Sequence, residues 1–69
     1  MSDSEIGQRL QWLREHRHPV LSRRVTSELM GLATNSLARY ERGEVRPSAE
    51  ALVKIADYYD VTVDWILGR

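Results

Sequence analysis

The chain has 69 residues, no cysteine and equal numbers of acidic and basic side chains, so its formal net charge is zero at pH 7. This length allows one small domain, near the lower limit for a self-sufficient core. The absence of cysteine excludes disulfides and thiolate metal sites. No apolar run approaches a membrane span and the start is too polar for a signal peptide, so we expect a cytoplasmic protein with no membrane partner.

The charges are unevenly spread along the chain. Residues 9–46 carry eight arginines against four carboxylates, a net charge of +4, whereas the segments before and after them carry −2 each. A basic centre between acidic ends is what a one-sided phosphate-binding surface requires. All but one of the basic residues are arginine, whose planar guanidinium suits bidentate contact with phosphate or guanine.

The first predicted helix covers about residues 4–17. Its apolar side chains recur at helical spacing and form one stripe: Ile6, Leu10 and Leu13. Ser2 followed by Glu5 suits a capping box at its start. Pro19 ends the pattern, because it lacks a backbone donor and disfavours a helical residue before it.

The second predicted helix begins after Ser22, a good N-cap, and continues to about Met30. Its spacing predicts that Val25, Leu29 and Met30 face inward. Gly31 follows where a helix C-terminus commonly needs a left-handed residue.

The third predicted helix spans about residues 33–42 and stops at Gly43. Its expected core face consists of Ala33, Leu37 and Tyr40. The opposite face is polar and presents Asn35, Ala38, Arg39 and Arg42, with Thr34 and Ser36 near its edges. Asparagine can pair bidentately with adenine and arginine with guanine in the major groove. A polar helix face is usually only solvated, so this pattern alone does not decide for DNA.

Two more helices complete the prediction. Ser48 is a natural cap for the fourth, whose apolar stripe is Leu52, Ile55, Ala56 and Tyr59. Thr62 caps a short last helix over 63–67, which ends at Gly68. No alternation typical of strands competes, so the fold class is all-α, a compact bundle of five short helices.

The second and third helices are short and joined by a tight turn at Gly31. Such a pair, here over residues 22–42, is the arrangement that places one helix in the DNA major groove. The layout therefore indicates a partner, double-stranded DNA, as well as a fold.

The same residues resemble a known family. The stretch GLATNSLARYERG, the RPS after it and LVKIADYYDVTVDWILGR closely resemble the helix-turn-helix domains of phage repressors and Cro proteins, also called the XRE family. The likeness covers about residues 6–68 and implies a single lambda-repressor-like domain. It further implies a transcriptional regulator, typically a repressor, that binds a palindromic operator as a homodimer.

The resemblance also assigns roles by position. The positions implied to contact DNA bases are Thr34, Asn35, Ser36 and Arg39. Those implied to contact phosphates are Arg23, Arg42 and Arg46. An ion pair between Arg14 and Glu41 is implied to tie the first helix to the end of the third. A candidate dimer surface lies near the C-terminus at Trp65 and Ile66, although core packing of Trp65 is an equal alternative.

Three departures from the family pattern qualify these roles. The connection HRHPV between the first two helices is longer than usual, which bears on the orientation of Arg23. Ser27 replaces the alanine common in the family's second helix, and Ala33 stands where the family usually has a Ser or Thr cap, so Thr34 is an alternative cap. We favour a structural role for Arg14 over DNA contact. Glu41→Ala is therefore expected to weaken DNA binding only through loss of stability.

Other functions find little support in the sequence. His16 and His18 flank a predicted loop and are expected on the surface rather than on a metal. Catalytic triads, paired carboxylates and glycine-rich phosphate loops are absent, so we expect no enzyme, cofactor or small-molecule ligand. Trp12 and Tyr58 fall off the apolar stripes of their helices and are expected to be lone surface aromatics. Two alternatives remain: a protein-interaction module that does not read bases, which an exposed aromatic such as Trp12 would suit, and an antitoxin-like autoregulator.

Overall fold

Residues 3–69, which the computed structural model describes, form five α-helices and no strand. They are α1 (Asp3–His16), α2 (Arg23–Leu29), α3 (Ser36–Glu41), α4 (Ala49–Tyr59) and α5 (Val63–Leu67). The predicted all-α class is confirmed. The proposed capping box involves Ser2, which lies outside the described residues. Within residues 3–69, no helix combines the length and hydrophobicity needed to cross a membrane.

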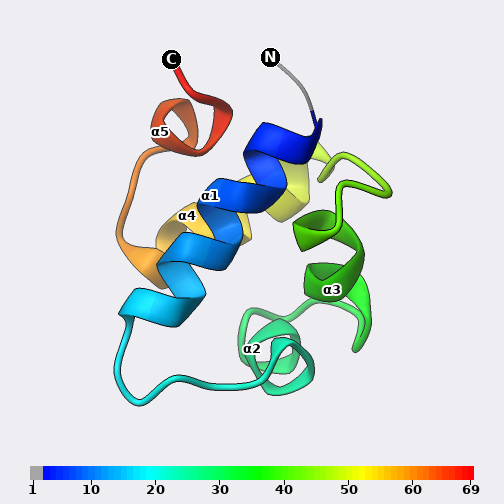
Figure 1. Ribbon diagram of the computed structural model, residues 1–69, viewed down its shortest axis with the longest axis vertical. Helices are drawn as coiled ribbons and strands as arrows, with labels where there is room; N and C mark the ends of the chain where they lie inside the picture. Colours follow the sequence, from blue (N-terminus) through cyan, green and yellow to red (C-terminus); the bar gives the residue numbers. More distant parts are fainter. Residues whose placement is uncertain (1–2) are drawn as a thin grey trace.

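Figure 1 shows α1 crossing α4, with α2 and α3 to one side of it and α5 to the other. Its buried stripe joins side chains from all the other helices except α2 in one apolar core. The fully buried members of that core are Ile6, Leu10, Leu37, Ile55 and Ile66. The pair α2–α3 joins this core through Met30, which follows α2, and through Leu37 of α3, and α3 also packs against α1.

Short polar signals set the helix ends as predicted. The hydroxyls of Ser22, Ser48 and Thr62 each accept a hydrogen bond from the backbone N–H three residues later, at 3.0–3.1 Å. The glycines after α2, α3 and α5 adopt φ angles of 78°, 72° and 81°, in the left-handed region that glycine tolerates.

The prediction for the inward face of the second helix is confirmed for Met30, which is buried in the core, and wrong for Val25 and Leu29. Val25 and Leu29 are 42 % and 58 % exposed, whereas Thr26 and Ser27 are buried beside Met30. The two buried hydroxyls donate to backbone carbonyls one turn earlier, at 2.7 and 2.8 Å, so burial leaves neither without a partner. Small, internally satisfied side chains let α2 approach its neighbours closely, which the two larger residues would prevent.

Helix α3 begins later than predicted. Residues 33–35 form a turn, closed by a 2.9 Å bond from the N–H of Ser36 to the carbonyl of Ala33, and regular helix starts only at Ser36. Ala33 is exposed and not part of the core, and Thr34 does not cap the helix. The left-handed Gly31 and this turn together connect α2 to α3.

Helices α1 and α3 touch through their backbones at Gly7. A Cβ atom there would lie 2.5 Å from the carbonyl oxygen of Tyr40 and 2.6 Å from that of Glu41. Both atoms belong to backbone that cannot move aside without shifting α3. Glycine at this position therefore sets the distance between α1 and α3.

Two predictions about aromatic and C-terminal residues also need correction. Ile66 is fully buried, so it belongs to the core and cannot form a dimer surface, whereas Trp65 is 40 % exposed. Tyr58 is not a lone surface aromatic: it is partly buried against the core and packs edge-on against Tyr59, with ring centroids 5.1 Å apart. The guanidinium of Arg17 lies 5.4 Å from both ring centroids.

Candidate nucleic-acid interface

Three of the four residues that the resemblance assigns to base contacts lie on the outside of the molecule. Thr34 and Asn35 are exposed in the turn that leads into α3, and Arg39 is exposed one helical turn further on. Ser36, the first residue of α3, is partly buried. The start of α3 thus presents a hydroxyl, an amide and a guanidinium to solvent, the groups that pair with base edges.

The start of α3 is capped by a residue of α2. Asn35 occupies the N-cap position, yet its side chain makes no capping hydrogen bond. Instead, the Ser27 hydroxyl accepts a hydrogen bond from the backbone N–H of Leu37 at 3.0 Å. The Asn35 amide is therefore left to the exposed surface. This cap could not be predicted from the sequence, because no local pattern signals a contact between residues ten positions apart.

A buried carboxylate lies behind this surface. The side chain of Glu41 is only 1 % exposed and accepts two hydrogen bonds from Arg14, from Nε at 2.8 Å and from Nη2 at 3.1 Å. Arg14 also donates from Nη1 to the carbonyl of Leu21 at 3.2 Å. Donation of hydrogen bonds to Glu41 raises the pKa of Arg14, and burial opposes that rise only in part. The pair ties α1 to the end of α3.

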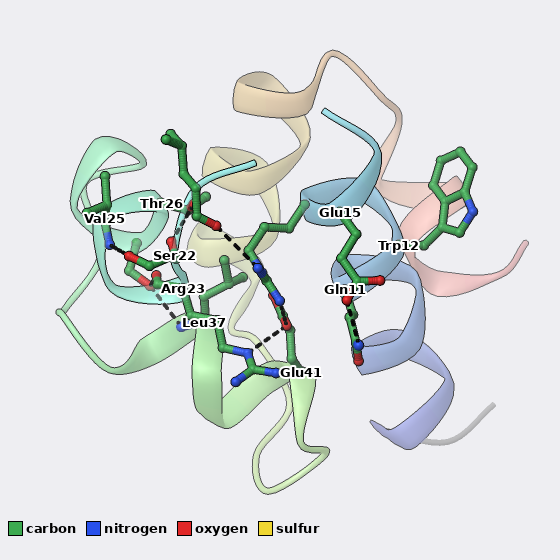
Figure 2. A network of polar contacts seen from close by, with 12 residues as sticks. Gln11, Trp12, Glu15, Ser22, Arg23, Val25, Thr26, Leu37 and Glu41 are labelled. Atoms are coloured by element: carbon green, nitrogen blue, oxygen red, sulfur yellow. Dashed lines mark hydrogen bonds and ion pairs between the residues drawn. The ribbon is translucent and has the colours of Figure 1, made fainter. Parts of the chain in front are cut away.

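Arg23 reaches the same carboxylate from the first turn of α2. Its Nε donates to Oε1 of Glu41 at 2.9 Å, and its side chain is 41 % exposed. Figure 2 shows Arg23 directed from α2 toward Glu41, with the dashed line ending on that carboxylate. The resemblance to phage repressors implied only a phosphate contact here, so its bond to Glu41 is a finding that sequence analysis missed.

A surface groove brings Arg14 and Arg23 together with the start of α3. It has a volume of about 570 Å³ and lies between the start of α2 and the turn before α3. Its lining residues are Arg14, Ser22, Arg23, Arg24, Thr34, Asn35 and Ala38. The structure thus brings together Arg23, Thr34 and Asn35, which sequence analysis had assigned to phosphate and base contacts.

The other two arginines assigned to phosphates lie outside that groove. Arg42 follows the last residue of α3 and is hydrogen-bonded to Glu44, and this bond raises the pKa of Arg42 and lowers the pKa of Glu44. Arg46 lies in the loop before α4 and donates from Nε to Asp3 at 2.9 Å. Both pairs are exposed, so a phosphate would compete with a hydrated carboxylate for each arginine.

Among residues 3–69, no three histidine or acidic side chains lie close enough together to hold a metal ion. His16 stacks on Trp12 with ring centroids 4.2 Å apart, and its Nδ1 lies 2.9 Å from the Trp12 carbonyl oxygen. The side chains that line the groove are arginines, an amide and hydroxyls, which recognise anions and base edges.

An all-helical domain in which a short capped helix follows a tight turn and presents its first residues outward is a helix-turn-helix domain. Residues 5–65 match the family described as Helix-turn-helix domain, which is most of the chain. The chain belongs to this family.

Curated relatives are similar over the same region. The HTH-type transcriptional regulator AnsR of Bacillus subtilis (strain 168) is 50 % identical over 44 residues, covering 64 % of this chain and 38 % of that protein. The cryptic phage CTXphi transcriptional repressor RstR of Vibrio cholerae is 42 % identical over 40 residues, 58 % of this chain and 36 % of its own. The uncharacterized HTH-type transcriptional regulator YobD of Bacillus subtilis is 39 % identical over 61 residues, which cover 88 % of this chain and 53 % of that protein. The chain thus spans only about a third to a half of their length.

Proposed function

We propose that the protein is a sequence-specific DNA-binding transcriptional regulator, acting as a repressor, that lays α3 in the major groove. The observation that carries this proposal is the exposed row of Thr34, Asn35 and Arg39 beside an arginine-lined groove. Relatives named as transcriptional regulators, one of them as a phage repressor, support it.

Base reading falls to the turn and first half of α3. The Asn35 amide suits adenine and the Arg39 guanidinium suits guanine, each by paired hydrogen bonds. Thr34 and Ser36 supply hydroxyls at the edges of that surface. Since Ser27 caps α3, reading a base with Asn35 would cost the helix no capping bond.

Phosphate contacts would hold the domain in register on the duplex. Arg23 is the best placed for this role, because it lines the same groove as Thr34 and Asn35. Arg42 and Arg46 extend the basic surface past the end of α3, after exchanging their carboxylate partners for phosphates. Binding of this kind weakens steeply as salt rises.

A palindromic operator and a homodimer complete the proposal. Two copies would place their α3 helices in half-sites about one helical turn apart. Trp65 remains a proposed dimer contact, and Trp12 lies beside it with ring centroids 6.1 Å apart. The exposed Trp12 also fits the rival function, a protein-interaction module without base reading.

Selection from a randomised duplex pool at physiological salt, followed by sequencing of the bound fraction, tests the proposal. Enrichment of a palindrome is the expected result. Retention without enrichment would reduce the function to phosphate binding. Absence of retention would favour the protein-interaction module.

A further inference from the structure

Two guanidinium groups and one carboxylate meet at Glu41. Arg14 and Arg23 each carry one positive charge and Glu41 carries one negative charge, so this bonded group keeps one uncompensated positive charge. It adjoins the groove at the start of α2. A DNA phosphodiester carries the single negative charge that would balance the group.

The two arginines differ in what they still offer. Arg14 uses Nε and Nη2 on Glu41 and Nη1 on a backbone carbonyl, and its side chain is only 12 % exposed. Arg23 uses only Nε, and within residues 3–69 no hydrogen bond engages either of its Nη groups. All three nitrogens of the Arg14 guanidinium therefore bond within the protein. Arg23 is bonded through Nε, and its two Nη groups can still donate hydrogen bonds to a ligand.

We infer that Glu41 positions Arg23 for DNA binding, an inference that rests on the proposed function. It holds the Arg23 guanidinium through Nε, so that the two Nη groups face one backbone phosphate in the groove. A guanidinium can do both at once because its donors form a rigid planar fork, whereas a lysine ammonium is a point charge on a flexible stem. Orientation before binding also reduces the side-chain entropy lost on binding.

The groove explains why this orientation matters for recognition. Its lining places Arg23 near Thr34 and Asn35, so a phosphate held by Arg23 sets where the start of α3 meets the bases. The expectation that loss of Glu41 acts on DNA binding only through stability is thereby revised. Removing this carboxylate also releases a phosphate-binding arginine.

Arg23→Lys and Arg69→Lys form a pair that tests the inference. Both substitutions keep the charge, but Arg69 is exposed, follows α5 and does not line the groove. Affinity for a short duplex of mixed sequence is measured by fluorescence anisotropy, at a temperature where circular dichroism shows each variant fully folded. Mixed sequence is chosen because phosphate contacts do not depend on the bases.

We expect Arg23→Lys to bind about tenfold more weakly than wild type, as for loss of one charge-assisted hydrogen bond, and Arg69→Lys to stay within about twofold. A purely structural role for the Arg23–Glu41 bond would lower the melting temperature and leave the affinity of the folded variant unchanged. Equal affinities of the two lysine variants would overturn the inference. Failure of the wild type to bind any duplex would instead overturn the proposed function on which it rests.

Glu41→Gln provides a second variant with nearly the same shape. If it folds, Arg23→Lys should cause a smaller loss of affinity in the Glu41→Gln background than in the wild type, since the anchor is already weakened. Additive losses would contradict the positioning role. If Glu41→Gln does not fold, the comparison of Arg23→Lys with Arg69→Lys decides alone.

Discussion

The hydroxyl of Ser27 holds α2 and α3 together by accepting a 3.0 Å hydrogen bond from the backbone N–H of Leu37. The same hydroxyl donates to the Arg23 carbonyl at 2.8 Å, so it is fully engaged although completely buried. It gives α3 the cap that Asn35 does not provide. One side chain therefore fixes the angle of the helix pair and leaves the proposed reading surface uncommitted.

Ser27→Ala should destabilise the fold by about 1–3 kcal/mol, because the Leu37 N–H would stay buried without its acceptor. Chemical unfolding followed by circular dichroism measures the change. Ser4→Ala, which removes an exposed hydroxyl from α1, is the control and should stay within about 0.5 kcal/mol. Equal stability of the two variants would show that the Ser27 cap contributes nothing.

Gly7→Ala should lower the free energy of unfolding by about 1–3 kcal/mol, although alanine favours helix more than glycine does. The added methyl would meet the backbone carbonyls of Tyr40 and Glu41, which lie too close to accept it. Gln8→Ala at the next, exposed position is a suitable control. A rise in melting temperature for Gly7→Ala would mean that α1 and α3 do not touch there.

Glu41→Ala should cost about 3–5 kcal/mol, because it leaves the nearly buried Arg14 without its counter-charge. Arg23→Ala should cost only about 0–1 kcal/mol, since its side chain is 41 % exposed and water can replace the pair. Thermal and urea unfolding of both variants measure the difference. A Glu41→Ala protein as stable as the wild type would remove the structural role of the pair.

Tyr59 should make stability depend on alkaline pH. Burial, with added repulsion from the charge of Glu41, raises the pKa of its phenol from 10.0 to about 12. The unfolded chain therefore loses this proton first as pH rises, so the contribution is complete below pH 10 and is lost as pH rises to about 12.

Tyr59→Phe isolates this contribution. The variant should lose less stability than the wild type between pH 10 and about 12, measured by urea unfolding across that range. At neutral pH it should be at least as stable, because within residues 3–69 the buried Tyr59 hydroxyl has no hydrogen-bond partner. Parallel pH profiles of the two proteins would contradict the raised pKa.

Local chemistry explains which parts of the fold could be predicted. Ser22, Ser48 and Thr62 cap helices through bonds to residues three positions on, and Gly31 and Gly43 end helices by their own backbone freedom. Signals of this kind are complete within one turn of sequence. These signals predicted the order of the helices. The spacing of apolar residues predicted the buried stripe of α4.

The predictions failed where burial or helix contact depends on residues far apart in the sequence. The spacing of Val25 and Leu29 suggested an inward face, but α2 buries Thr26 and Ser27 because their hydroxyls satisfy backbone carbonyls and because small side chains fit there. The close approach at Gly7 depends on α3, more than thirty residues further on. No periodicity carries such information.

In the candidate site, too, local features could be predicted and contacts between distant residues could not. Thr34, Asn35 and Arg39 are exposed as expected for residues that face DNA. That Arg23 shares Glu41 with Arg14 depends on how α1, α2 and α3 meet, and it came only from the structure.

The most direct test of base reading by α3 compares the motifs that wild type and Arg39→Ala select from the same randomised duplex pool, with Arg42→Ala alongside. Arg39→Ala should lose preference at one base pair in each half-site, at a cost of about 1–3 kcal/mol, and keep the rest of the motif. Arg42→Ala should bind all sequences more weakly with the motif unchanged. An identical motif from wild type and Arg39→Ala, or equal losses on selected and random DNA for both variants, would contradict base reading by Arg39 on α3.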